Sequence, residues 1–257
     1  MRHFWLGIAA IAFLAPQARA LDVDAARHLL TRTGFAATTQ EAEALRPLDR
    51  AAAVDRVLAT ARTQTVTPPP AWAARYVPTP PVARLDEAAR RKYQDELRDQ
   101  QIELKSWWMR ELANTPAPVG EMLTLFWHGH FTSSLQKVRP PILMYRQNQL
   151  FRQHALGNFG ALLAGVLHDP AMLFYLDNVA NRKGAPNENL ARELLELFTL
   201  GEGNYAEADI KNIARALTGY AFDPENGEFR VFWARHDIGP KTIFDKSSEF
   251  TGDDVVK

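Results

Sequence analysis

The sequence predicts a mainly α-helical protein, an irregular orthogonal bundle of many helices with a small β-hairpin near residues 220–245. Three observations indicate this class. Apolar residues recur at spacings of three and four through most of the chain, which is the period of a helix with one buried face. Cap residues precede many of these segments, and glycines follow several of them. The period changes to two only after Tyr220.

Residues 1–20 have the pattern of a cleavable secretory signal peptide. Arg2 supplies a positive start, an apolar run extends to Ala15, and residues 18–20 match the small-x-small cleavage pattern. The apolar run is shorter than the roughly 20 residues that a membrane-spanning helix needs. We therefore expect export through the general secretory route, to the periplasm or beyond, with no transmembrane segment in the mature chain.

The mature chain would be nearly neutral and contains no cysteine. Removing residues 1–20 takes away two arginines and leaves 28 basic and 30 acidic side chains, a formal charge of −2. A nucleic-acid-binding protein needs a basic patch or stripe, so we expect no nucleic acid partner. Without cysteine there are no disulfides, thiolate metal sites or iron–sulfur clusters. Stability must come from a packed core, which a 46% hydrophobic composition can supply.

The helices fall into two regions joined by a proline-rich connector. Residues 21–62 predict three short helices, one of them started by Thr38 and Glu41 in the spacing of a capping box. Residues 63–83 contain six prolines. Proline fixes φ and removes an amide donor, so this segment predicts an extended connector.

Residues 84–257 form the main helical domain. Its longest predicted helix, 84–113, carries Trp107 and Trp108 near its end, where their large apolar area can attach the helix to the core. Further helices are predicted over 119–127, 141–156, 159–167, 170–176, 187–200 and 206–218.

The hairpin is predicted from alternation. Phe229, Val231 and Trp233 are spaced by two and follow a turn segment rich in Asp, Pro, Asn and Gly, and residues 242–244 add a short third strand. Near the C-terminus, Thr251 and Asp254 predict a capping box, yet only three residues follow. We therefore expect the main domain to be incomplete at its C-terminal side.

His128 and His130 are the first candidates for chemistry, as ligands of a divalent transition metal. In a helix two such side chains lie about 200° apart and cannot share an ion, whereas in an extended segment they point to the same side. Gly129 weakens a helix here, so the extended geometry stays open. The pattern alone favours two inert histidines, because two ligands do not complete a site.

Glu193 is the second candidate. In the predicted helix, Glu188, Arg192 and Glu196 have the spacing of a surface ion-pair ladder, but Glu193 lies at the edge of the apolar face beside Leu197. A half-buried carboxylate there would serve as a metal ligand or as a general base with a raised pKa. A solvated helix face explains the pattern as well and is favoured.

His236 and Asp237 follow the predicted hairpin, where an adjacent histidine and acid suit acid–base chemistry or metal binding. A polar turn accounts for the same pair. A second polar segment allows either anion binding or capping of helix ends; it contains Asp177, Asn178, Asn181, Arg182 and Lys183.

Several ordered blocks resemble a bacterial family, the domain-of-unknown-function family 1800. They are residues 29–35, 126–134, 147–159, 169–220, 235–244 and 250–254. The resemblance implies an exported, mainly helical protein, often encoded beside another exported family of sulfatase-like type. It implies no activity, so no catalytic residue can be carried over. Members usually continue past the 250–254 block, which agrees with the expected truncation.

Two functions fit these observations. The first is a metal-dependent enzyme of the cell envelope, with His128, His130 and Glu193 as ligands and Glu193, His236 or Asp237 as catalytic groups. The second is a non-catalytic binding or assembly module that acts with an exported partner. The proline-rich connector and the aromatic residues Trp72, Trp107 and Trp108 favour the second.

Overall fold

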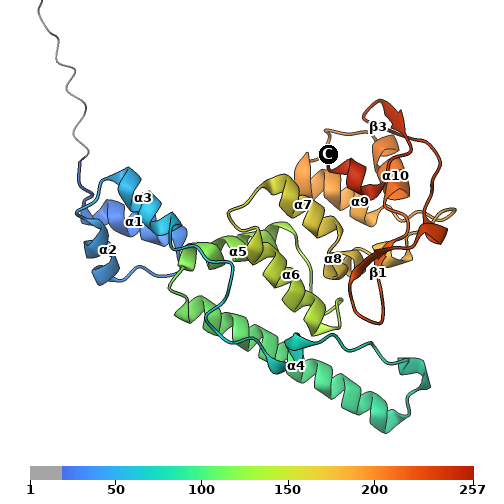
Figure 1. The fold of residues 1–257 in the computed structure, drawn as a ribbon, viewed down its shortest axis with the longest axis horizontal. Coiled ribbons are helices and arrows are strands. Elements are labelled where there is room, and N and C mark those ends of the chain that lie inside the picture. Colours follow the sequence, from blue (N-terminus) through green and yellow to red (C-terminus); the bar gives the residue numbers. More distant parts are fainter. Residues whose placement is uncertain (1–18) are drawn as a thin grey trace, which may run out of the picture. The chain divides into compact units, whose positions relative to one another are not determined.

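The computed structural model describes residues 19–257 and is mainly helical, as predicted (Figure 1). The predicted signal peptide, apart from its last two residues, lies outside the described residues. The chain divides into two compact units between Thr60 and Ala61. Among the helices within residues 19–257, none combines the length and apolar composition of a membrane span.

The first unit consists of three short helices, α1 (Val23–Thr33), α2 (Thr39–Leu45) and α3 (Arg50–Leu58). The predicted capping box starts α2: the Thr38 hydroxyl accepts from the Glu41 N–H at 3.2 Å, and the Glu41 carboxylate accepts from the Thr38 N–H at 2.8 Å. Small residues dominate the buried positions, so the helices can approach closely. These positions are Ala26, Ala42, Leu45, Ala53 and Val57.

The second unit contains the remaining helices. They are α4 (Glu87–Asn114), α5 (Pro118–His130), α6 (Pro141–Gln153), α7 (Phe159–Leu167), α8 (Pro170–Tyr175), α9 (Asn189–Glu193), the π-helix η4 (Leu194–Thr199), α10 (Glu207–Ala216) and α11 (Gly252–Val255). Four 3₁₀ turns join them: η1 (Ala71–Ala74), η2 (Val82–Arg84), η3 (Asn178–Ala180) and η5 (Trp233–Arg235). α6 packs against α4, α5, α7 and α8 and so lies at the centre of this unit.

Two apolar clusters form the core of the second unit. The larger one is built by α6 to α10 together with the end of α5 and strands β1 and β3, and it includes Phe131, Phe151, Leu163, Leu190, Leu194, Phe198 and Ile213. The smaller one surrounds Trp107, whose side chain is fully buried, and includes Tyr76, Leu104, Leu143 and Met144. Trp107 therefore attaches α4 to α6, as its size predicts.

The proline-rich segment is fastened to α4 at its start. The backbone N–H groups of Val66 and Thr67 donate to the Glu111 carboxylate, at 3.1 and 2.7 Å, and the Trp107 indole N–H donates to the Thr67 carbonyl at 3.1 Å. Glu111 is buried, and these bonds satisfy its carboxylate. The segment is thus held by specific polar contacts.

Strands form two antiparallel hairpins. β1 (Tyr220–Phe222) pairs with β2 (Phe229–Val231), which confirms the predicted hairpin. β3 (Lys241–Ile243) covers most of the predicted third strand, but pairs with β4 (Lys246–Ser248) instead of extending the first hairpin. The alternation ends at Val231 because residues 233–235 form the turn η5.

Two predicted helices differ in detail. α5 continues through Gly129 to His130. A side chain at Gly129 would meet no atom within 4 Å, so glycine serves no close contact there. The predicted helix 187–200 changes at Leu194 into a π-helix, in which the Leu200 N–H donates to the Leu195 carbonyl five residues earlier. π-Helical turns are rare and occur frequently at functional sites.

Candidate functional site

α5 places its two histidines on opposite sides. Because the segment is helical, His128 and His130 project about 200° apart and cannot share an ion. The extended geometry that would let them chelate one metal does not form. Each imidazole has its own surroundings, which differ in burial and in hydrogen bonding.

His128 ends a buried polar network. Arg152 donates to the Asn148 side-chain carbonyl at 2.7 Å, which turns the Asn148 amide N–H toward His128 Nε2 at 3.1 Å. Nε2 is thus an acceptor, and the ring proton lies on Nδ1. Burial and the nearby Arg152 guanidinium lower the pKa of His128 to about 3, so the ring is neutral at physiological pH.

The same network contains a buried ion pair. Arg152 donates twice to the Glu121 carboxylate, at 2.5 and 2.9 Å, and the Trp108 indole N–H donates to that carboxylate at 3.0 Å. The side chains of Arg152 and Glu121 are 0% and 4% exposed. Both charged groups of this network, Arg152 and Glu121, find partners, which is what a buried charge requires.

His130 faces a different environment. Its Nε2 lies 3.0 Å from the Phe198 carbonyl oxygen. A carbonyl can only accept, so Nε2 carries the proton and Nδ1 is left as the basic nitrogen. The ring stacks on Phe126 and contacts the edges of Trp127 and Phe131, which fixes its orientation.

His130 and Glu193 line one pocket of about 500 Å³. The end of α5, the segment after it, the end of α8, α9 and η4 form its walls. The lining residues are His130, Thr132, Lys137, Tyr175, Leu176, Asn189, Arg192, Glu193, Leu197 and Phe198. Two of the predicted site residues, from helices more than 60 positions apart in sequence, are therefore brought together.

Glu193 has a raised pKa, first because of partial burial and second because of the charge on Glu196. Neither a hydrogen bond nor an ion pair within residues 19–257 opposes this shift. The π-helix begins directly after Glu193 and turns Phe198 inward, while Leu197 stays 64% exposed at the pocket. A carboxyl group of this kind keeps its proton closer to neutral pH than an ordinary glutamate.

The two cations of the pocket already have partners. Lys137 Nζ lies 2.8 Å from Asp177 Oδ2, and Arg192 pairs with Glu188, Glu196 and Glu207 at 2.9–3.3 Å. Carboxylates therefore outnumber cations around Glu193.

Asp177 adopts a left-handed backbone conformation with φ 60°, which is sparsely populated for residues other than glycine. Such local strain is found most often near functional sites. Its position beside Lys137 places it at the edge of the pocket.

His236 and Asp237 do not line this pocket. His236 is buried and donates through Nδ1 to the Thr218 carbonyl at 2.8 Å. Asp237 pairs with Arg215 at 2.7 Å, and this hydrogen bond lowers the pKa of Asp237. Both side chains fasten the loop after η5 to the end of α10. These contacts fit the alternative stated above, in which His236 and Asp237 belong to a polar turn.

The polar segment 177–183 caps helix ends. The Asn178 amide donates to the carbonyls of Leu217 and Tyr220, and the Asn181 amide donates to that of Ala214 and to the Asn178 side chain. Both asparagines are buried. They satisfy carbonyls at the C-terminus of α10 that the helix itself leaves free.

The donor set for a metal is smaller than the sequence suggested. Within residues 19–257 no three His, Asp or Glu side chains lie close enough to hold an ion. His130 and Glu193 share a pocket, whereas His128, His236 and Asp237 are engaged elsewhere. Zinc sites with open positions use three protein ligands, so this pair alone does not complete one.

Sequence reasoning missed several residues of the His130–Glu193 pocket and of the buried Glu121–Arg152 network. Lys137 lies in a turn and Tyr175 lies at the end of α8, where no periodic signal exists, whereas Asp177 belongs to the polar segment that the sequence already singled out. The Glu121–Arg152 pair left a weak signal: Glu121 is the only acid in an otherwise apolar helix segment, a position that needs a buried partner.

Fold and pocket together define a mainly helical protein with a mixed polar and apolar pocket at a π-helix. The chain belongs to the family described as "Protein of unknown function (DUF1800)", which matches residues 28–257. Neither a curated protein nor a solved structure matches the chain.

Proposed function

We propose that this protein is an exported enzyme that carries out general acid–base chemistry in the pocket of His130 and Glu193. One observation carries the proposal: a carboxyl group with a raised pKa, which has no hydrogen-bond or ion-pair partner among residues 19–257, shares a pocket with an imidazole whose Nδ1 is available. Perturbed carboxyl groups in a cleft are typical of functional sites. The signal-peptide pattern of residues 1–20 supports export.

The two groups suit complementary roles. Glu193 accepts a proton from the substrate or from water, and His130 takes up or returns one at Nδ1 while Nε2 stays bonded to the Phe198 carbonyl. This bond holds the ring in place in both protonation states. The pocket therefore supports proton abstraction or the activation of water for hydrolysis.

Charge limits the substrate class. The pocket cations Lys137 and Arg192 are already paired with carboxylates, so a negatively charged substrate gains no free cation. Leu176, Leu197 and Phe198 supply apolar contacts. A neutral or positively charged substrate with an apolar part fits this lining best.

A metal-dependent reaction has less support. His130 and Glu193 supply one nitrogen and one oxygen donor, a chemistry that suits zinc or manganese. The substrate or water would have to complete the coordination. The experiment below therefore also tests whether the reaction depends on a metal ion.

The test is a substrate screen with matched variants. The secreted protein is assayed against neutral and cationic esters, amides and glycosides, with and without a chelator and added zinc or manganese. Glu193→Gln and His130→Gln are each expected to reduce turnover by about 100-fold or more. Glu188→Gln, on the same helical segment but outside the pocket, should retain activity. Equal turnover in all four proteins would refute the proposal.

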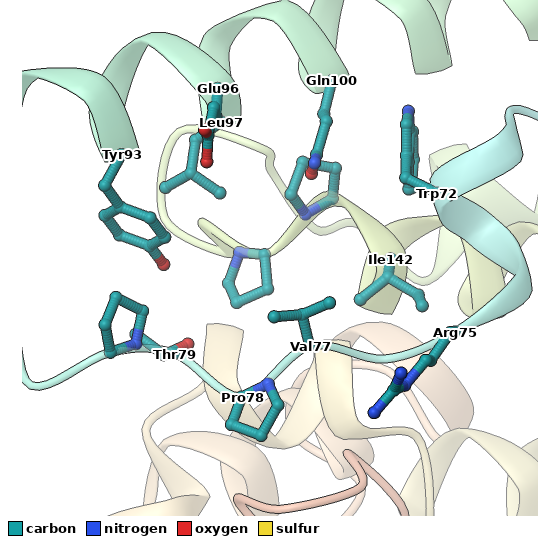
Figure 2. A pocket seen from close by; sticks show the side chains of 13 residues that line it. Trp72, Arg75, Val77, Pro78, Thr79, Tyr93, Glu96, Leu97, Gln100 and Ile142 are labelled. Carbon is teal, nitrogen blue, oxygen red and sulfur yellow. The ribbon is translucent and has the colours of Figure 1, made fainter.

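A non-catalytic binding module is the second candidate, favoured by a separate pocket of about 350 Å³. In Figure 2, Tyr93 and Leu97 point from α4 toward Val77 and Pro78 of the proline-rich segment. Aromatic rings line the grooves that accept extended, proline-rich peptides. Trp72 lies at this pocket, whereas Trp107 is buried, so only the former is free to contact a partner.

Co-purification tests this alternative. Trp72→Ala and Tyr93→Ala should each release a partner that the unmodified protein retains from an envelope extract. Met109→Ala, an exposed position on the same helix, is the control. Recovery of the unmodified protein alone under mild conditions would refute the second candidate.

A further inference from the structure

A third, smaller cavity lies on the His128 side of α5. Its volume is about 140 Å³. α4, α5, α6 and the segment after α5 form it, all within the second unit. The lining residues are Leu104, Lys105, Trp107, Trp108, His128, Leu135, Met144 and Asn148.

The walls of this cavity are apolar and largely aromatic. Trp107, Trp108 and His128 contribute three rings, and His128 packs against Trp108 with ring centroids 4.7 Å apart. Leu104 and Met144 are buried in the same cluster as Trp107. These side chains are held by the packing of three helices, so the cavity is preformed.

Few polar groups line the cavity, and the His128 imidazole is one of them. His128 Nε2 accepts from Asn148, which leaves the Nδ1–H without a hydrogen-bond partner within residues 19–257. One donor among apolar walls is a common arrangement in ligand sites.

The size matches a single ring. Apolar cavities of about 150 Å³ in proteins stay dry and bind benzene. A volume of about 140 Å³ is therefore close to that of a six-membered ring and too small for a nucleoside or a sugar dimer. Aromatic walls favour an aromatic ring, since edge-to-face and offset contacts add to simple burial.

The rim carries a positive charge. Lys105 is exposed and, among residues 19–257, forms no ion pair, in contrast to Lys92 on the same helix. No acidic residue lines the cavity. A ligand that places its ring inside and a negative group at the rim would therefore meet an available ammonium group.

We propose that this cavity binds a small aromatic carboxylate, with the ring between Trp107, Trp108 and Met144 and the carboxylate at Lys105. The site is separate from the pocket of His130 and Glu193 and does not depend on the function proposed for that pocket. Phenylacetate is the simplest probe of this chemistry.

Calorimetry and ligand-observed NMR on the intact protein test the proposal with three probes. Phenylacetate should bind saturably with one site per chain. Benzyl alcohol, which lacks the carboxylate, and cyclohexylacetate, which lacks the aromatic ring, should bind more weakly.

The variants assign the binding to the cavity. Met144→Phe and Leu135→Phe fill it and should weaken phenylacetate binding at least tenfold, whereas Met109→Phe, on the exposed side of α4, should leave it unchanged. Lys105→Gln should weaken phenylacetate about threefold to fivefold and leave benzyl alcohol unaffected. Circular dichroism confirms that each variant is folded.

Three results would overturn the proposal. They are no saturable binding of phenylacetate, unchanged binding in folded Met144→Phe and Leu135→Phe proteins, and cyclohexylacetate binding as tight as that of phenylacetate. Since Lys105→Gln alters only an exposed side chain, its result stands even if the filling variants do not fold.

Discussion

The two faces of α5 show how the same residue type acquires different properties. His128 is buried, neutral and bonded to an amide whose orientation is fixed by Arg152. His130, two positions later, stands at an open pocket with its basic nitrogen available. On the first face every charge has a partner, whereas at the second face Glu193 has no partner in the part of the chain that the structure describes.

The difference separates polar groups that stabilise the fold, such as the Glu121–Arg152 pair, from a polar group such as Glu193 that is available for chemistry. A buried charge without a partner costs several kcal/mol, so the Glu121–Arg152 face is satisfied completely. A half-buried carboxylate at a pocket is tolerated without a partner because water reaches it, and its raised pKa is then available for chemistry. The predictions below alter one face at a time.

The largest effect is expected from Arg152→Ala. It leaves the Glu121 carboxylate buried with only the Trp108 indole as donor, and removes the group that orients Asn148. The free energy of unfolding should fall by about 3–5 kcal/mol. Urea unfolding followed by circular dichroism measures it.

Arg192→Ala is the matched control for this loss. Arg192 also pairs with glutamates, but its side chain is 35% exposed and its ion pairs are screened by solvent, so the loss should be much smaller than that of Arg152→Ala. Equal losses for the two arginines would mean that burial does not distinguish the two faces.

The second effect is a pair of opposing pH dependences. Burial raises the pKa of Asp169 to about 7, although Gln147 and two backbone N–H groups donate to it. The folded state therefore holds this proton more tightly than the unfolded chain, and stability falls as pH rises from about 4 to about 7. For His128, whose folded pKa is about 3, stability is lost as pH falls below about 6.5.

Between about pH 4 and pH 6.5, Asp169 makes the free energy of unfolding fall with rising pH, whereas His128 makes it rise. Unmodified protein should show a shallow profile in this window. Asp169→Asn should make stability rise with pH, and His128→Asn should make it fall, each by up to about 1.4 kcal/mol per pH unit. Thermal unfolding across the window measures both. Parallel profiles for the two variants would contradict these assignments.

The third effect compares the histidines directly. His128→Ala leaves the buried Asn148 amide without its acceptor and removes a ring packed on Trp108 and Phe151, so a loss of about 2–3 kcal/mol is expected. His130→Ala removes one hydrogen bond to a carbonyl, worth about 1 kcal/mol, and ring contacts to Phe126 and Trp127, but it leaves no buried side-chain donor without an acceptor, so its loss should be smaller than that of His128→Ala. A larger loss at His130 would reverse the comparison.

These two faces also mark the limit of prediction from sequence. Local signals were sufficient for helix starts: Thr38 and Thr251 form the capping boxes that their spacing predicts, and α7 (Phe159–Leu167) has the predicted bounds. The mainly helical fold class and the first hairpin could likewise be predicted, from the period of the apolar residues.

The surroundings of the histidines could not be predicted, because their partners are distant in sequence. Asn148 lies 20 residues from His128, and the Phe198 carbonyl lies 68 residues from His130. Only the packing of α6 and η4 against α5 decides which histidine is buried and which one lies at the open pocket. The π-helix itself depends on backbone hydrogen bonds that are shifted by one residue, and such a shift has no compositional signature.

The smallest effect on stability, and the most informative for function, is expected from Glu193→Gln. Since Glu193 has no partner among the described residues and is repelled by Glu196, the amide should change the free energy of unfolding by less than about 0.5 kcal/mol. Glu196→Gln should cost about 1 kcal/mol, because the Glu196 carboxylate accepts from Tyr205 at 2.5 Å and pairs with Arg192. Urea unfolding of both variants decides between them. If Glu193→Gln were the more destabilising of the two, Glu193 would be a structural residue, and the acid–base proposal would lose the observation that carries it.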